Sequence, residues 1–201
     1  MRKLTVNTFL TLDGVMQAPG GPGEDPRGGF SHEGWSVGYW DDVMNDAMND
    51  YMGKPFAMLL GRKTYEIFAG AWPQSKEPGA KEINEAKKYV ASKTLKQVSW
   101  QNSELLAGDV AEEIRKLKTL DGPEIQVHGS SNLLQTLLKN DLIDEYNMKI
   151  FPVTIGKGKR LFGDGAMPAG FKLVDSKIST TGVIAAKYVR DGEIKKGSFG
   201  S

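Results

Sequence analysis

The stretch PFAMLLGRKTYEIFAG, residues 55–70, carries the clearest indication of the fold. Its first six residues form a continuous apolar run, which is typical of a strand buried on both faces of a parallel sheet. The run ends at Gly61, and the segment TYEIFAG at residues 64–70 is typical of a short helix. A buried strand that passes directly into a helix predicts an α/β fold.

The alternation of strands and helices continues on both sides of this stretch. Strands are predicted at residues 3–12, 55–60, 86–92, 97–100, 124–128 and 143–153. Helices are predicted within residues 40–53, 64–70, 109–120 and 129–138, and a closing antiparallel hairpin at residues 171–179 and 183–190. This order predicts a central, mostly parallel mixed sheet that is flanked by helices and has an antiparallel edge. A length of 201 residues fits a single domain over residues 1–201.

The composition excludes several classes of function. The formal net charge is +1, which argues against a nucleic-acid or membrane-surface partner. The chain has no cysteine and only two histidines, His32 and His128, so we expect no disulfide, no iron–sulfur cluster and no metal site. No segment has the apolar stretch of a secretion signal or the ~20 apolar residues of a membrane span. We therefore expect a cytoplasmic protein.

Basic and hydroxyl side chains follow the buried strand at residues 55–60. Gly61 allows a ligand to approach the backbone closely, and the helix that follows offers unpaired N–H groups to a phosphate. Arg62 and Lys63 add positive charge at the same place, and the Thr64 hydroxyl can donate to a phosphate oxygen. The alternative is a capped helix with exposed basic residues.

A second strand-to-helix junction repeats this design in the sequence EIQVHGSSNLLQTLL. The predicted strand ends at His128, and Gly129, Ser130 and Ser131 lead into a helix. The two serines have an alternative role as ordinary N-caps. However, the carboxyl ends of parallel strands line one crevice, which is where ligands bind in such sheets. Two junctions of this kind therefore favour a shared phosphate site.

A third junction places Ser92, Lys93 and Thr94 directly after the strand predicted at residues 86–92, although a solvated turn explains it equally well. Together with Arg62 and Lys63, Lys93 would form a cluster of cations. Such a cluster suits a pyrophosphate with a further phosphate, and we therefore predict a preference for NADPH over NADH. The G-x-G-x-x-G fingerprint and the P-loop are both absent, so any nucleotide would bind by another architecture.

Residues 19–38 form a long loop rich in glycine and proline, followed by aromatic residues. Loops of about 15 residues or more are often functional lids. Trp35, Tyr39 and Trp40 are candidates for stacking on a flat heterocycle, and the alternative is that they anchor the loop to the core.

Several motifs resemble known reductases. GRKTYE at residues 61–66 and LTLDGVMQAPG at residues 10–20 resemble the dihydrofolate reductase fold. The closer resemblance is to the reductase domain of riboflavin-biosynthesis deaminase–reductases and their stand-alone relatives. It is carried by four segments, VHGSSNLLQTLL, IDEYNMKIFPV, IGKGKRLF and YVRDGEIKKGSF. The resemblance covers the chain apart from residues 19–38.

The resemblance implies a dihydrofolate reductase-like three-layer fold with NADPH along the carboxyl ends of the strands. On the family pattern, the cofactor-binding residues would be Leu12, Gly14 and Met16 beside the nicotinamide, Gly61, Arg62, Lys63 and Thr64 at the phosphates, Ser92, Lys93 and Thr94 at the adenosine end, and His128, Gly129, Ser130 and Ser131 at the pyrophosphate. Members of the family are often homodimers, which makes the closing hairpin a candidate interface.

The catalytic residues stay open at this point. Dihydrofolate reductases have a carboxylate on the first helix, and here Asp41, Asp42, Asn45 and Asp46 compete for that position. Asp42 and Asp46 are retained as candidates, although helical aspartates are often merely solvated. Lys149 on an inner strand is a third candidate, with a solvent-facing lysine as the alternative.

These observations predict an NADPH-dependent reductase that transfers a hydride to a small heterocycle. The resemblance implies a reaction like that of 5-amino-6-(5-phosphoribosylamino)uracil reductase in riboflavin synthesis, or the reduction of dihydrofolate or a pterin. The chain lacks the cysteine ligands that a zinc deaminase domain would need. Two alternatives remain, a non-catalytic protein that binds NADPH or a flavin, and a purely structural dimer module.

Overall fold

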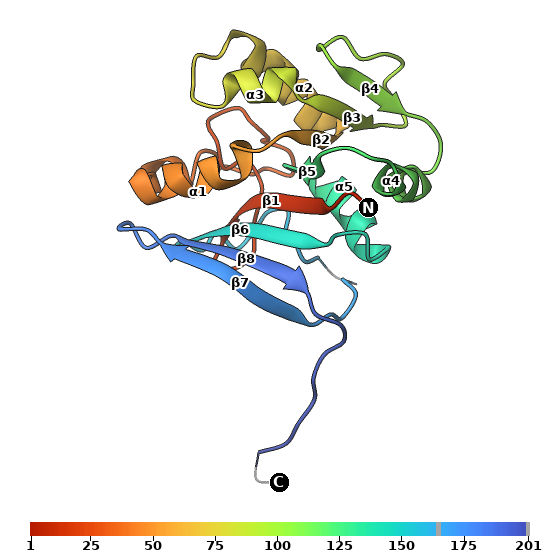
Figure 1. Cartoon of the computed structure of the whole chain (residues 1–201). Helices are drawn as coiled ribbons and strands as arrows, with labels where there is room; N and C mark the ends of the chain where they lie inside the picture. The colour runs from red at the N-terminus through yellow and green to blue at the C-terminus, as the bar shows by residue number, and fades with distance from the viewer. Residues whose placement is uncertain (164–165, 200–201) are drawn as a thin grey trace.

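A computed structural model describes residues 1–163 and 166–199 of the chain. Its centre is an eight-stranded sheet with the order β4-β3-β2-β5-β1-β6-β8-β7 (Figure 1). The strands are β1 (Leu4–Thr11), β2 (Phe56–Gly61), β3 (Lys87–Ala91), β4 (Ser103–Leu106), β5 (Glu124–Val127), β6 (Glu145–Phe151), β7 (Phe171–Ile178) and β8 (Ile184–Arg190). Neighbouring strands from β4 to β6 are parallel, whereas β8 is antiparallel to both β6 and β7. The predicted parallel sheet with a closing antiparallel hairpin is confirmed.

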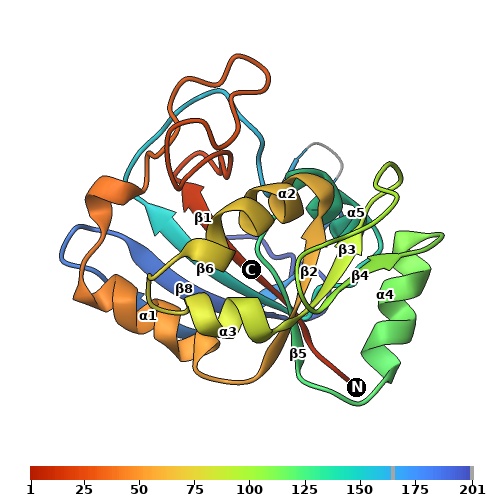
Figure 2. The same ribbon diagram turned by 90° about the horizontal axis from the view of Figure 1, so that it is seen from above.

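Helices cover both faces of this sheet. They are α1 (Asp42–Met52), α2 (Arg62–Ala71), α3 (Ala80–Glu85), α4 (Val110–Thr119) and α5 (Ser131–Lys139), with short 3-10 turns at Val37–Tyr39 and Trp72–Gln74. Helices α4 and α5 pack with Leu59 of β2, while α2 and α3 pack with Met58 and Leu60 of the same strand. Because successive side chains of a strand point to opposite faces, the protein has three layers. Figure 2 shows α1 and α3 on the side of the sheet away from α4 and α5.

The strand β2 shows how this layering follows from the sequence. All six of its residues are buried, as expected for the continuous apolar run at residues 55–60. A strand without a polar side must be covered on both faces, so it occupies the interior of the sheet between β3 and β5.

Helix α1 is placed by its cap and its apolar face. The Asp41 carboxylate accepts a hydrogen bond from the Met44 amide at 2.9 Å, which fixes the start of the helix. Met44, Ala47 and Tyr51 are buried, because they recur at helical spacing and face the sheet. The backbone N–H of Gly53 donates to the Asn49 carbonyl and closes the helix.

The strand predicted at residues 97–100 is wrong. The amides of Ser99 and Trp100 both donate to the Tyr65 hydroxyl, at 2.9 and 3.0 Å, and are therefore not available to a neighbouring strand. The Trp100 side chain is buried in the cluster formed with α2 and α3. The fourth strand, β4, lies further along the chain, where it pairs with β3. The short helix α3 and the two 3-10 turns were not predicted either.

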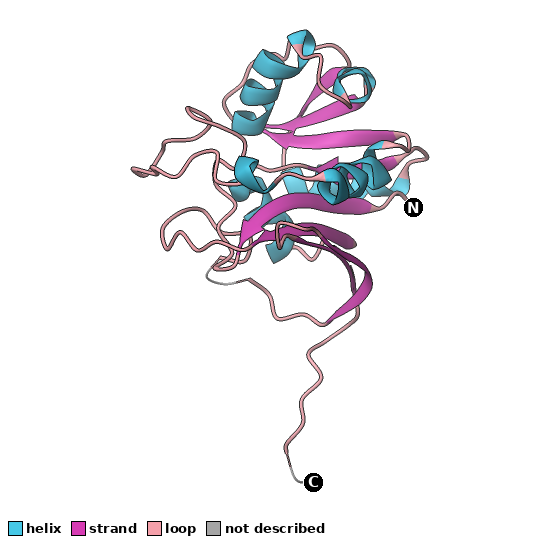
Figure 3. Cartoon of the chain, turned by 90° about the vertical axis from the view of Figure 1, so that its left-hand side faces the viewer, coloured by secondary structure: helices cyan, strands magenta, loops and turns pink. Residues whose placement is uncertain are grey.

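Beyond β8 the chain leaves the body of the molecule. Residues 191–199 extend away from the sheet, as Figures 1 and 3 show. Within the described residues, no helix is long and apolar enough to cross a membrane.

Candidate functional site

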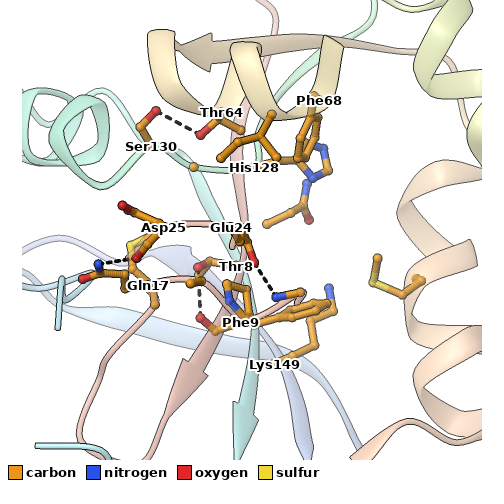
Figure 4. Close-up of a pocket in the computed structure, with 18 of the residues that line it drawn as sticks. Thr8, Phe9, Gln17, Glu24, Asp25, Thr64, Phe68, His128, Ser130 and Lys149 are labelled. Carbon is orange, nitrogen blue, oxygen red and sulfur yellow. Dashed lines mark hydrogen bonds between the residues drawn. The ribbon is translucent and has the colours of Figure 1, made fainter. Parts of the chain in front are cut away.

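A cavity of about 740 Å³ opens at the carboxyl ends of the parallel strands (Figure 4). Its lining comes from the strands β1 and β6, from the helices α1 and α2, and from the segment that joins β5 to α5. Residues 16–20 and part of the long loop that follows them cover it from outside the sheet. The cavity therefore lies where parallel α/β sheets bind their ligands.

The first and second strand-to-helix junctions meet at the wall of this cavity. A Cβ atom on Gly61 would lie 2.2 Å from Ser130 Oγ, so only glycine allows this close approach. The Thr64 and Ser130 hydroxyls are 3.0 Å apart and hydrogen bonded. Gly129 has a φ of +112°, which side-chain-bearing residues rarely adopt, and the peptide bond that joins it to Ser130 is cis. Thr64, Gly129, Ser130 and Ser131 line the cavity, as does His128.

Neither helix that starts at these junctions has a side-chain cap. Gly61 precedes α2 and Ser130 precedes α5, and neither position supplies a capping hydrogen bond. The Ser130 hydroxyl is hydrogen bonded to Thr64 instead. The alternative interpretation of this serine, as a residue whose side chain caps the helix, therefore does not apply. The first N–H groups of both helices therefore have no side-chain partner, which is the arrangement that binds phosphate.

The cations of the first junction do not all face the cavity. Lys63 lines it and pairs with Glu66 at 2.7 Å. Arg62 lies outside and pairs with the same carboxylate at 2.6 Å, and it also donates to the Thr94 hydroxyl at 2.6 Å. These exposed pairs are weak in water, so a phosphate can displace them. Hydrogen bonds from Lys63 and Arg62 lower the pKa of Glu66, and burial, which acts in the opposite direction, does not reverse this.

The third junction lies outside the cavity. The Ser92 hydroxyl accepts hydrogen bonds from the amides of Thr94 and Leu95, which makes this segment a turn. None of Ser92, Lys93 and Thr94 lines the cavity. The bond from Arg62 to Thr94 nevertheless holds the turn against the first turn of α2.

Only one of the three predicted residues that follow β1 reaches the cavity. Met16 lines it, whereas Leu12 and Gly14 do not. The Leu12 side chain is 63% exposed, since its amide bonds to the Val153 carbonyl and turns the side chain outward. Gly14 has a φ of +79° and serves the turn that brings Met16 back over the sheet.

The three aromatic residues divide between the two roles expected for them. Trp40 lines the cavity, with its ring 5.8 Å from that of Phe9. Trp35 and Tyr39 instead pack edge-on against Phe151, at 5.2 and 6.0 Å, and do not line the cavity. These two side chains anchor the loop to the core.

Asp42 and Asp46, the two catalytic candidates on α1, do not reach the cavity. Asp42 and Asp46 are exposed and lie outside the cavity, because they occupy the face of the helix opposite Met44. Asp41 is engaged as the cap of α1 and also accepts hydrogen bonds from Thr180. Asn45 is the remaining candidate of this group. It lines the cavity, but its side chain is an amide and not a carboxylate.

Lys149 is a buried lysine on the floor of the cavity. Its side chain comes from β6, and the residue is 3% exposed. The Nζ atom lies 4.3 Å from the centre of the Tyr51 ring. Burial lowers the pKa of this lysine to about 7. The alternative of a solvent-facing lysine therefore does not apply.

His128 stands next to this lysine as a neutral side chain. Burial, reinforced by the charge of Lys149, lowers its pKa to about 4. The Gln126 amide nitrogen donates to the Tyr51 carbonyl and to Glu124, which leaves the amide oxygen of Gln126 as an acceptor. The His128 Nε2–H group donates to that oxygen at 3.1 Å.

The long loop brings acidic residues to the cavity that sequence reasoning missed. Burial acts to raise the pKa of Asp25, but hydrogen bonds from Arg27 and Lys159 lower it to about 2. Burial raises the pKa of the neighbouring Glu24, which also lines the cavity. The Gln17 amide donates to the carbonyls of Asp25 and Arg27 and ties the loop down. No local pattern signals these contacts, since they depend on how a loop without regular structure folds back.

Three layers, a parallel sheet with an antiparallel hairpin and a cavity at the carboxyl ends of the strands define a dihydrofolate reductase-like fold. Residues 2–185 match the family model of the RibD C-terminal domain, so the chain belongs to that family. The expected resemblance is confirmed. An uncharacterized protein of Bacillus subtilis (strain 168), YyaP, is 26% identical over 201 residues, which cover 95% of this chain and 96% of that protein.

Solved structures share the fold at low sequence identity. A putative riboflavin biosynthesis protein from Shewanella sp. PV-4 superposes with a TM-score of 0.67 at 20% identity, over 95% of this chain and 99% of that one. A pyrimidine reductase-like protein from Corynebacterium diphtheriae has a TM-score of 0.62 at 14% identity, over 96% and 93%. Dihydrofolate reductase from Enterococcus faecalis, complexed with NADP(H), has a TM-score of 0.58 at 14% identity, over 94% and 96%.

Proposed function

We propose that this protein is an NADPH-dependent reductase that acts on a small planar heterocycle. The observation that carries the proposal is the meeting of two uncapped helix ends, those of α2 and α5, on the wall of one cavity. Membership of the RibD C-terminal domain family supports a reductase. The names of the Shewanella and Corynebacterium relatives favour a pyrimidine of riboflavin synthesis, and the dihydrofolate reductase likeness keeps a pterin as the second substrate class.

The residues at the first two junctions fit a pyrophosphate. Thr64 and Ser130 present hydroxyl groups, and the N–H groups at the start of each helix are free of side-chain caps. Lys63 brings a positive charge that becomes available when its exposed pair with Glu66 opens. Gly61 keeps the two junctions close enough for one ligand to bridge them.

The third junction fits the additional phosphate that distinguishes NADPH from NADH. Arg62 and the turn of Ser92, Lys93 and Thr94 lie together just outside the cavity, where the adenosine end of a bound nucleotide would emerge. A guanidinium is suited to two-pronged binding of phosphate.

The inner end of the cavity would hold the substrate ring. Phe9, Trp40, Tyr51 and Phe68 form apolar walls around it and exclude water. When bound, NADPH supplies the hydride, so this chain has to orient two flat rings against each other. Met16 would flank the nicotinamide, because it follows β1 and lines the cavity.

The test is a titration of the protein with NADPH and with NADH, followed by fluorescence. In the double variant Arg62→Ala/Lys93→Ala, NADPH binding should weaken by about tenfold or more (~1.4 kcal/mol) because the additional phosphate loses its partners. NADH binding should change much less. Lys116→Ala is the matched control, because Lys116 is an exposed lysine of α4 on the opposite face.

Two results would contradict this proposal. If wild-type protein binds neither nucleotide, the cavity has another use. If the double variant loses affinity for NADPH and NADH equally, the assignment of the third junction to the additional phosphate is wrong.

A further inference from the structure

The floor of the cavity is formed by two adjacent strands whose polar side chains point toward α1. In the parallel pair of β1 and β6, Asn7 lies opposite Asn147 and Phe9 lies opposite Lys149. Residues two apart on a strand share a face, so all four side chains are on this side of the sheet. Asn7, Phe9 and Lys149 line the cavity, and Figure 4 shows Phe9 and Lys149 together at its base.

Lys149 has no hydrogen-bond acceptor among the residues that the structure describes. Its Nζ makes no hydrogen bond and no ion pair with any of residues 1–163 and 166–199, and its close neighbour is the face of the Tyr51 ring. The charged group that acts on it from α1 is Asp50, which is already paired with Lys177 at 2.6 Å. His128, which faces it from the end of β5, is neutral and donates its Nε2–H group elsewhere. A buried amine in these surroundings is costly unless a ligand supplies the acceptor.

Asn7 provides a second donor without a partner on the same floor. Its Oδ1 accepts a hydrogen bond from the Asn147 amide at 3.0 Å, which fixes the orientation of the Asn7 side chain. Its Nδ2 is buried and has no partner in the described part of the chain, and the whole residue is 5% exposed. Asn7 and Lys149 lie on adjacent strands, one side-chain repeat apart, which is about 7 Å along the sheet. Buried polar atoms without a partner are rare in folded proteins, so Asn7 Nδ2, beside a lysine that makes no hydrogen bond with the described residues, points to a ligand.

The walls around these donors determine the shape of the ligand. The Phe9 and Trp40 rings stand on one side, and the rings of Tyr51, Phe68 and His128 stand on the other. A flat ring fits between aromatic side chains, and its edge would then meet the floor. Helix α1 contributes Asn45 and Asn49 to the lining but no carboxylate, so Lys149 Nζ and Asn7 Nδ2 are left on this floor as donors for an acceptor of the ligand.

We infer that Lys149, with Asn7 beside it, forms a donor subsite for an oxo or carboxylate oxygen on the edge of a flat heterocyclic substrate. The inference rests on the proposed function and narrows its substrate class. Rings that present oxygen acceptors are selected, and rings that present amino groups at the same edge are rejected, because an amino group would leave two donors facing each other.

A matched pair of probes tests this inference. Lumazine (2,4-dioxopteridine) and 2,4-diaminopteridine share one ring system and differ in whether their edge carries oxygen or amino groups. Binding is measured by fluorescence at pH 7 without nucleotide. Wild-type protein should bind lumazine at least about tenfold more tightly than the diamino compound. Lys149→Met should abolish that preference, and Lys149→Gln, which keeps a donor of reduced reach, should retain part of it.

The control is Lys87→Met, which removes an exposed lysine of β3 that pairs with Glu104 away from the cavity, and which should leave the preference unchanged. The inference is overturned if wild-type protein binds both probes equally, if it prefers the diamino compound, or if Lys149→Met retains the preference for lumazine. The affinity of the same variants for NADPH is measured in parallel and should not change. Failure of the wild type to bind NADPH would count against the proposed function alone, because the probe titration contains no nucleotide.

Discussion

Two of the buried lysines, Lys88 and Lys149, have different surroundings. Lys88 of β3 is fully buried, and its Nζ donates to the carbonyls of Asn84, Ala86 and Gln101 at 2.7, 2.9 and 3.3 Å while lying 4.1 Å from the centre of the Trp100 ring. Lys149 has a similar aromatic neighbour, but no acceptor among residues 1–163 and 166–199. Burial lowers the pKa of both, to about 8 for Lys88 and about 7 for Lys149. Burial of a lysine therefore does not indicate its role, whereas the supply of acceptors does.

The largest effect on stability is expected at Lys88. In Lys88→Met, three inward-facing carbonyls lose their donor, and the free energy of unfolding should fall by ~3 kcal/mol. Urea denaturation measures this difference. Ligand binding by the folded fraction should not change, since Lys88 does not line the cavity. A variant as stable as the wild type would remove the distinction between the two lysines.

The second expected effect is on the pH dependence of stability. The pKa of Lys149 is about 7 in the folded protein and 10.5 for the ordinary side chain, so between these values the unfolded chain binds more protons. Stability should therefore rise with pH over this window, by up to ~1.4 kcal/mol per pH unit from this residue. Lys149→Met should be more stable than the wild type at pH 7 and should flatten the rise between pH 7 and pH 9. Part of the rise above pH 8 should persist, because Lys88 contributes with the same sign.

A third prediction concerns the backbone N–H groups at the start of α2 and α5, which have no side-chain cap. In Gly61→Ala the added Cβ would lie 2.2 Å from Ser130 Oγ, so the two junctions must separate. NADPH binding should weaken by about tenfold (~1.4 kcal/mol), measured by fluorescence titration. Gly70→Ala is the control in the same helix, since a Cβ there meets nothing within 4 Å, and it should bind like the wild type. Unchanged binding in Gly61→Ala would show that the junctions do not form the phosphate site.

The smallest effect on stability is expected at an exposed apolar surface of the sheet. The edge strand β7 exposes Phe171, Leu173, Val174 and Ile178, with exposed fractions from 37% to 72%. Exposed apolar edge strands favour association, and we propose that a second copy of the chain covers this one. Leu173→Lys should shift the protein from dimer to monomer in sedimentation velocity without a large loss of stability. A wild-type protein that sediments as a monomer would contradict the proposal.

The side of the cavity proposed to bind phosphate was largely predictable from the sequence, because it is built from local segments. Gly61 and the residues after it, like the segment from Gly129 to Ser131, follow directly on buried strands, and parallel pairing brings such segments together. The strand predicted at residues 97–100 failed because the Tyr65 hydroxyl takes up the amides there.

The substrate side was less predictable, because its residues come from distant strands and a helix. Asp42 and Asp46 do not lie on the face of α1 that packs against the sheet. Which face this is depends on which apolar residues of the helix pack there. Lys149 was a candidate, but its importance depends on the register with Phe9 and on the absence of an acceptor from the described residues around it. No pattern within one segment contains that information.

The most direct test of the proposed reductase activity is turnover. Wild-type protein is mixed with NADPH and, in turn, with oxo-pyrimidines and oxo-pteridines, while the absorbance of the reduced nicotinamide and the mass of the heterocycle are followed. At least one oxo compound should be reduced with equivalent loss of NADPH, and Lys149→Met should reduce it about tenfold or more slowly. If NADPH and an oxo heterocycle bind together in this cavity and neither is converted, the protein is a binding protein and not a reductase.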